Sequence, residues 1–241
     1  MEGGSRLSNK GITFDGKHSF RDFGLTLANR IIGNPRKLKI KERVPYSNQM
    51  YDFSGVYGDQ EYEERRLTYV FNIRDYDKVG LETKKTAVTN WLMRPFRKSK
   101  LIDDYIPGYY FMAEVEDEPT FDEGRFVGRL SITFTAYPFR IAEREEGHDI
   151  WDEFNFLLDV AQVTAFEVGG ELQTSLYNPG IKKAYPIIKA SAPMKIEKGG
   201  VIYTVQAGET QSFDFHLLPG KNDIVITGNG SISFHFRKEL I

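Results

Sequence analysis

The sequence predicts a mainly β protein built from two domains. Apolar and polar residues alternate with a period of two in several stretches of the first half, which is typical of half-buried strands. One stretch changes to helical spacing, and the second half is a series of short strands separated by Gly- and Pro-containing turns. A chain of 241 residues is long enough for two modest domains, each with its own core.

The first half is expected to contain strands interrupted by one helix. The alternating stretches lie at about 12–14, 37–44, 67–73, 109–115 and 126–137. An amphipathic helix is expected over about 82–94, with Trp91 on its buried face and Asp77 as a candidate N-cap. Pro95 is expected to end this helix because proline lacks a backbone donor.

The polar segment IAEREEGHD, residues 141–149, predicts the connection between the domains, because charged residues and a glycine favour exposed backbone. We therefore expect an N-terminal domain over 1–140 and a C-terminal domain over 141–241. The turn spacing in the second domain predicts a β-sandwich or barrel. Residues 217–241 are interpreted as two strands joined by a Gly-Asn-Gly turn, with Phe213 and Phe234 directed into the core and His235 directed away from it.

Composition limits the classes of function. The absence of cysteine excludes a disulfide framework, a thiolate nucleophile and a Cys-ligated zinc site. Lys and Arg number 32 against 34 Asp and Glu, and this balance gives no indication of a specific nucleic-acid or membrane partner. No apolar run approaches the ~20 residues of a membrane span, and the first residues lack a signal peptide, so a soluble chain made in the cytoplasm is expected.

No motif in the chain predicts a catalytic, cofactor or metal site. Residues 11–18, GITFDGKH, have the frame of a phosphate-binding loop, but His18 stands where a magnesium ligand is needed, so a turn between strands is expected. Residues 75–80, DYDKVG, resemble the start of a calcium loop without its later ligands and predict a turn or helix entry. The four histidines are scattered and are expected at solvated or edge positions.

A basic stripe follows one predicted strand. Its members are Lys37, Lys39, Lys41 and Arg43. A phosphate group or an acidic neighbour could contact such a stripe, but a charged strand face is usually the solvated side of a sheet. We therefore expect it to face solvent or another subunit.

The order of several segments resembles one known family. FDGKHSFRDFGLTL, then VPYSNQMYDFSGVYG and YEERRLTYVFNI, and then a helix ending in WL resemble the N-terminal region of the distal tail proteins of long-tailed phages (siphophages) or prophages of Gram-positive bacteria. The second half adds NPG at 178–180, the strand YPIIKA and PGKNDIVITGNGSISFHFR in the family's order. The resemblance spans nearly the whole chain. The stretch YSNQM departs from the Gly-rich turn expected before Tyr51, which leaves the shape of this loop open.

This resemblance implies a non-enzymatic structural hub of the phage tail tip or baseplate. Its N-terminal domain would be a β-barrel-like or split β domain that forms a hexameric ring, and its C-terminal domain a galectin-like β-sandwich. The homo-hexamer would join the tail tube protein to the tail-tip or tail-associated lysin protein, with a receptor-binding protein as a further partner, and would surround the DNA channel without reading DNA. The protein would be synthesised in the host cytoplasm and located at the tail tip of the virion.

Tyr51 and Phe53, in the resembling segment, are the candidate subunit-interface residues. The alternative is that both pack inside their own subunit. The sequence is also compatible with two other functions. The first is a carbohydrate-binding module, and the second, less favoured, is a cell-wall hydrolase whose catalytic residues converge only in space. Trp91 and Trp151 are the strong stacking platforms that a carbohydrate-binding module would offer, and Trp91 is expected on a buried helix face.

Overall fold

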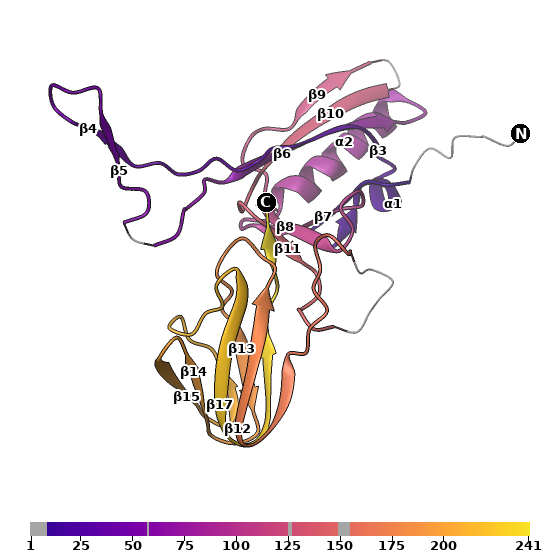
Figure 1. Cartoon of the computed structure of the whole chain (residues 1–241). Helices are drawn as coiled ribbons and strands as arrows, with labels where there is room; N and C mark the ends of the chain where they lie inside the picture. Colours follow the sequence, from indigo (N-terminus) through magenta and orange to yellow (C-terminus); the bar gives the residue numbers. More distant parts are fainter. Residues whose placement is uncertain (1–8, 57, 125–126, 149–154) are drawn as a thin grey trace, which may run out of the picture. The chain divides into compact units, whose positions relative to one another are not determined.

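The computed structural model describes residues 9–56, 58–124, 127–148 and 155–241 (Figure 1). The chain divides into two compact units, residues 1–140 with Ile241 and residues 141–240. Each unit is built mainly from strands and has its own cluster of buried apolar side chains. The mainly β fold class expected from the sequence is confirmed. No helix in these described ranges is long and apolar enough to cross a membrane.

The N-terminal unit is a curved antiparallel sheet with two helices. Its described elements are β1 (Ile12–Phe14), β2 (Lys17–His18), α1 (Ser19–Phe23), β3 (Thr26–Ile32), β4 (Lys41–Arg43), β5 (Met50–Asp52), β6 (Arg65–Arg74), α2 (Lys78–Met93), β7 (Ser99–Asp103), β8 (Tyr109–Glu114), β9 (Thr120–Glu123) and β10 (Val127–Ala136). The sheet order is β2-β1-β7-β8-β10-β6-β3, and β9 pairs with β10. The start of the expected strand over 126–137, Phe126, lies outside the described residues.

Strands β6 and β10 form the centre of this unit because they pair along their whole length. Leu67 lies opposite Phe134 and Tyr69 opposite Ile132, and all four side chains are buried. This is the period-two alternation that the sequence predicts for a half-buried sheet. Helix α2 lies beside β6 and β10 in Figure 1, and its buried residues belong to the same core cluster.

Helix α2 starts at Lys78, four residues before the expected start. Asp77 caps it by accepting a hydrogen bond from the Gly80 amide at 2.6 Å, so the cap and the helix entry are confirmed. Trp91 is 4% exposed, and its indole nitrogen donates to the Phe14 carbonyl at 2.8 Å. The predicted buried position of Trp91 is therefore confirmed.

The segment GITFDGKH is a tight hairpin formed by β1 and β2, as predicted. Asp15 and Gly16 both have positive φ, the backbone that a two-residue hairpin turn requires. Of the two positions expected for the histidines, solvated or edge, His18 has the second, on the edge strand β2. Its ring is buried rather than solvated and caps α1, accepting from the amides of Phe20 and Arg21 at 3.1 Å. Helix α1 was not predicted, because its five residues are too few to show the helical periodicity of apolar side chains.

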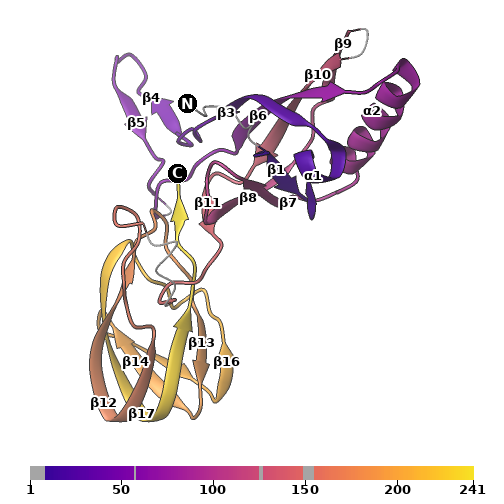
Figure 2. The ribbon, with the colours of Figure 1, turned by 90° about the vertical axis from the view of Figure 1, so that its right-hand side faces the viewer.

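The C-terminal unit is an antiparallel β structure. Its strands are β12 (Ala165–Asn178), β13 (Ile187–Ala190), β14 (Met194–Lys198), β15 (Val201–Val205), β16 (Gly208–Thr210), β17 (Gly220–His235) and β18 (Glu239–Leu240), and β11 (Arg140–Ala142) lies at the division between the units. The strand order is β15-β14-β17-β13-β16, and β12 pairs with β17. Figure 2 shows β12 and β17 side by side along the unit.

The expected Gly-Asn-Gly turn is not a turn but the middle of β17. Gly228 to Gly230 pair with residues 168–170 of β12, and the ladder continues on both sides. A Cβ at Gly228 would lie 2.7 Å from Cγ of Met194, so glycine allows the Met194 side chain to cross the strand. The N-terminal half of β17 pairs with β14 and the C-terminal half with β13, so β17 joins both groups of strands.

The predicted register of the C-terminal half of β17 is confirmed. Phe234 is buried, whereas His235 lies on the other face. The prediction for Phe213 is wrong, because its side chain is 87% exposed in the loop after β16.

The charged segment after residue 140 is not an exposed connection. The Ala142 amide donates to the Lys238 carbonyl at 3.1 Å, and the Glu146 amide donates to the Phe236 carbonyl at 2.9 Å. Glu146 is also buried and pairs with the buried Lys238. The described part of this segment therefore belongs to the C-terminal unit. The composition indicated solvated charges, but the charge of Glu146 is buried and paired with Lys238.

Candidate functional site

A long two-stranded ribbon leaves the N-terminal sheet between β3 and β6, and we call residues 34–64 the arm (Figure 1). Strands β4 and β5 pair with each other, and in the described chain they form a sheet of their own. Further pairs extend the ribbon toward its root, where the Leu38 amide donates to the Glu61 carbonyl and the Glu63 amide to the Arg36 carbonyl. The backbone of the arm is thus satisfied largely within the arm.

The arm has two chemically different faces. Glu42 lies opposite Tyr51, and the Phe53 amide donates to the Ile40 carbonyl, so these four side chains share one face. By the same alternation, Lys41 and Arg43 lie on the other face, where Asp52 and Met50 are their cross-strand neighbours. One face is therefore mainly apolar, and the basic stripe of the sequence lies on the opposite face.

The apolar face of the arm is exposed. Tyr51 is 60% and Phe53 is 43% exposed, and their ring centroids lie 6.2 Å apart. Ile40 and Leu38 on the same face are also exposed. Both candidate interface residues thus lie together on the arm and outside the core cluster of the N-terminal unit. The apolar face is therefore available for contact with another molecule.

Polar contacts fix the basic face of the arm. The Lys39 ammonium lies 2.9 Å from a carboxylate oxygen of Asp52, and the Ser54 amide donates to the other carboxylate oxygen at 3.0 Å. Hydrogen bonds from Ser54 and then from Lys39 hold the pKa of Asp52 below its usual range. Asp52 therefore stays ionised at neutral pH and partly neutralises the stripe.

Arg65 fixes the root of the arm. Its guanidinium is buried and donates to the carbonyls of Gly33 at 2.7 Å and Pro138 at 3.2 Å, and to the side chain of Asn34 at 3.3 Å. Burial, and then the nearby Arg140, lower the pKa of Arg65 to about 10, so it remains a cation at neutral pH. The guanidinium therefore holds together both ends of the arm and the end of β10.

A close backbone approach supports the same root. The Gly33 amide donates to the Arg66 carbonyl at 2.9 Å, and a Cβ at Gly33 would lie only 2.5 Å from that oxygen. Glycine is therefore required at this position for the two roots of the arm to pair.

A buried polar cluster holds β3, the strand that leads into the arm. Asp103 is buried at the end of β7, and it accepts from Arg30 of β3 at 2.6 Å and from the Tyr69 hydroxyl at 3.0 Å. Burial, with the Asp103 charge, raises the pKa of Tyr69, so the phenol stays protonated and donates. The arm therefore extends from a strand that a buried ion pair anchors to β7.

The histidines and carboxylates of the described ranges are the remaining candidates for a chemical site. In the described ranges no group of three His, Asp or Glu side chains is placed to hold a metal ion. The carboxylates Glu64 and Glu114 both pair with Lys98, at 2.7 Å and 2.8 Å. Trp151, one of the two candidate stacking platforms, lies outside the described residues.

Comparisons with known proteins find one matching family model and similar solved structures. Residues 31–136, which include the whole arm, match the family described as phage tail protein RIFT-related domain. A solved structure titled SPP1 Dit (gp 19.1) protein, a paradigm of hub adsorption apparatus in Gram-positive infecting phages, is similar over 96% of this chain and 99% of that chain, with a TM-score of 0.63 and 10% identity. The chain thus shares its fold with SPP1 Dit, in agreement with the resemblance.

Two structures of the phage p2 baseplate in its activated conformation also match. The structure with Sr gives a TM-score of 0.39 at 8% identity, and the structure with Ca gives 0.42 at 7% identity. Each match covers 92% of this chain and 92% of the other, but TM-scores this low carry no argument about the fold. No curated protein sequence matches this chain.

Proposed function

We propose that this protein is a structural hub of the tail tip of a long-tailed phage and works as a hexameric ring around the DNA channel. The phage tail domain over residues 31–136 supports a tail component, and the fold shared with SPP1 Dit, which its title describes as a hub, supports this position in the tail. In this role the ring joins the tail tube protein to the tip proteins that carry the lysin and receptor-binding functions. The protein needs no catalytic group for this work.

The arm is the observation that carries the proposal. An isolated two-stranded hairpin is only marginally stable in water, and stability requires that its apolar face be covered by further structure. In the described chain that face, with Tyr51 and Phe53, is exposed. In the ring, a second copy of the chain covers this apolar face. The arm of one subunit then contacts a different surface of the next subunit, and a heterologous contact of this kind can close a ring.

The charge of the chain fits a channel that DNA passes without being bound. The formal net charge is -2, and strong nonspecific binding to DNA requires a large excess of Lys and Arg. The basic face of the arm is partly neutralised by Asp52, so it is suited to a protein neighbour with carboxylates as well as to solvent.

The experiment places arm variants in tails assembled by a phage or prophage that lacks its own copy of this gene. Tyr51→Ser with Phe53→Ser removes the apolar contact, and Lys41→Ser with Arg43→Ser is the matched control on the opposite face of the same ribbon. We expect wild type and control to give tips with six copies around an open lumen, and the apolar-face variant to give tails without the ring. Unchanged melting of the purified variant shows that it folds.

Location decides the outcome. If the wild-type protein occupies peripheral fibres, the proposed hub function is wrong. If both pairs of substitutions leave six-copy tips intact, the proposed arm contact is wrong. A monomer of purified protein in dilute solution does not decide the question, because the tube and tip proteins add contacts to the ring.

A further inference from the structure

The C-terminal unit has an outward sheet face on strands that are separate from the arm. Strands β12, β17, β13 and β16 lie side by side at this end of the unit, and Glu209, Lys189, Ser233 and Ala165 are paired in one row across them. The residues between them along each strand, such as Ile188 and Phe234, are buried on the other face. The row is therefore on the solvent side of the sheet.

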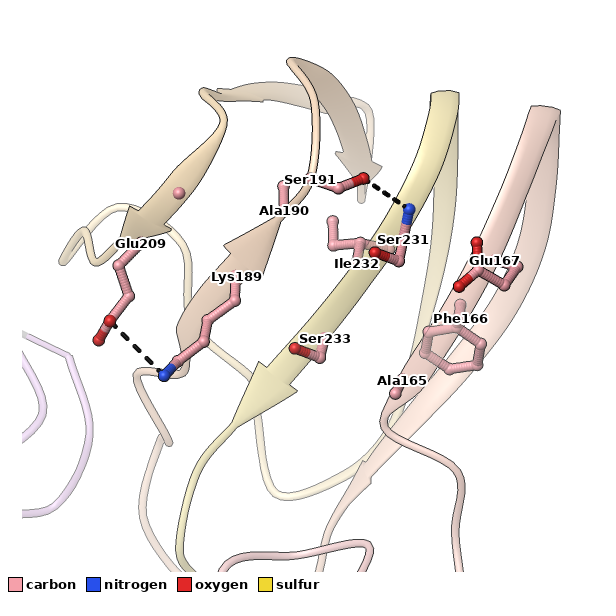
Figure 3. A pocket seen from close by; sticks show the side chains of 11 residues that line it. Ala165, Phe166, Glu167, Lys189, Ala190, Ser191, Glu209, Ser231, Ile232 and Ser233 are labelled. Atoms are coloured by element: carbon pink, nitrogen blue, oxygen red, sulfur yellow. Dashed lines mark hydrogen bonds and ion pairs between the residues drawn. The ribbon is translucent and has the colours of Figure 1, made fainter.

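This face is hollow in its middle (Figure 3). A cavity of about 530 Å³ lies over Ala165, Ser231 and Ser233, whose small side chains leave the sheet uncovered. Glu167 of β12 lies on one side, and Lys189 and Glu209 lie on the other, as Figure 3 shows. The Lys189 ammonium pairs with Glu209 at 3.5 Å, so the far rim carries no unbalanced cation.

The polar groups continue along β17 beyond the cavity. The Ser233 hydroxyl lies 3.0 Å from Nε2 of His235, and Nδ1 of His235 lies 2.8 Å from Glu145. Hydroxyl, imidazole, carboxylate and ammonium groups on one face provide both donors and acceptors for hydrogen bonds.

Tyr185 and Phe213 form an exposed aromatic pair outside the residues that line the cavity. Burial alternates from Ala184 to Ala190, which directs Tyr185 and Lys189 to the outward face. The Tyr185 ring lies edge to face with Phe213 at 5.6 Å and 5.9 Å from the His216 ring. Tyr185 and Lys189 are four residues apart, which is about 13 Å along an extended strand.

We propose that this face binds a neutral oligosaccharide of two or three sugar units. An aromatic ring packs against the apolar C–H face of a sugar, and the hydroxyls at the sugar's edge need the mixed donors and acceptors that line the cavity. The distance from Tyr185 of the aromatic pair to Lys189 at the rim of the cavity is about 13 Å, which two or three sugar rings can span. Because the Lys189 ammonium is already paired with Glu209 and Glu167 adds a second carboxylate, the face does not favour an anionic ligand.

This assignment differs from the two tryptophan platforms that the sequence offered. Tyr185 and Phe213 are far apart in the sequence, and Phe213 was expected in the core, so the pair was visible only after folding. A peptide ligand is less well matched, because an added peptide strand pairs with a sheet edge, and here the hollow lies on the face.

The test measures binding of the full chain to immobilised and soluble neutral trisaccharides, using maltotriose, cellotriose, mannotriose and galactotriose, with charged sialyl and uronic-acid trisaccharides beside them. Phe213→Ser removes the aromatic contact, and Ser233→Leu fills the hollow. Ile202→Ser is the matched control, since it replaces an exposed apolar side chain on β15, at the opposite edge of the strand order.

We expect at least one neutral trisaccharide to bind, with a Kd that rises about three- to tenfold in Phe213→Ser and stays unchanged in Ile202→Ser. Ser233→Leu is expected to abolish binding while ring assembly in tails continues. No binding of wild type to any neutral probe at millimolar concentration overturns the proposal. So does binding only of charged probes, or equal loss in the Ile202→Ser control.

Discussion

Replacing Arg65 tests whether the arm is held at its root. Arg65→Met keeps a long side chain but removes the guanidinium, so the buried carbonyl of Pro138 and the half-buried carbonyl of Gly33 lose their donors. Each buried acceptor left unsatisfied costs ~1–3 kcal/mol, and relief from burying a cation offsets part of this cost. We expect the free energy of unfolding of the N-terminal unit to fall by ~2–4 kcal/mol, which lowers its Tm by about 6–12 °C.

The adjacent residue provides the control. Arg66 is exposed and its nearest carboxylate, Asp117, is 3.8 Å away, so Arg66→Met is expected to cost less than ~1 kcal/mol. Urea unfolding measures both variants, and hydrogen exchange of the arm amides shows whether the ribbon opens at its root before the sheet does. Equal destabilisation by the two substitutions, or unchanged exchange in the arm of Arg65→Met, would refute the reasoning.

Three further predictions concern the two cores. Phe234→Ala is expected to cost the C-terminal unit ~3–5 kcal/mol and His235→Ala much less in denaturant titrations, and equal costs would overturn the register. Trp91→Phe is expected to cost ~1–3 kcal/mol because the Phe14 carbonyl loses its donor, and an unchanged urea midpoint would contradict this. Burial raises the pKa of Glu146 in the folded state. The stability that its protonated form contributes is therefore fully present below the unfolded pKa and is lost as the pH rises through the folded pKa. In Glu146→Gln the free energy of unfolding should depend less on pH in this window, and an unchanged pH dependence would exclude the effect.

The sequence was most informative where a pattern extends over many residues. Alternation predicted β6 and β10, and helical spacing with Asp77 predicted α2, because burial on one face imposes a period. The predictions failed where a residue's role depends on distant partners. The His18 ring can be buried because Asp104 and two amides satisfy it, and Gly228 lies inside a strand because it pairs with Gly170 of β12.

The candidate site shows the same limit. Alternation along Lys37 to Arg43 indicated a strand with one charged face, and the arm has that pattern. The sequence could not say whether the opposite face, with Tyr51 and Phe53, is covered by the same chain, because an apolar strand face is identical in composition whether it meets its own core or a neighbour. The exposure of these two rings had to come from the structure.

The shared ladder of β12 and β17 sets the order in which the C-terminal unit folds. Its rungs join residues roughly 40 positions apart at the Asn178–Gly220 end and almost 70 apart at the Ala165–Ser233 end. Loop closure costs less entropy for the shorter separation, so we expect the ladder to close first near Asn178 and to propagate toward Ala165. The pairing of β13 with β16 joins residues only about 20 positions apart, so we expect the Ala165 end of β12 to be the last part of the hollow sheet face to form.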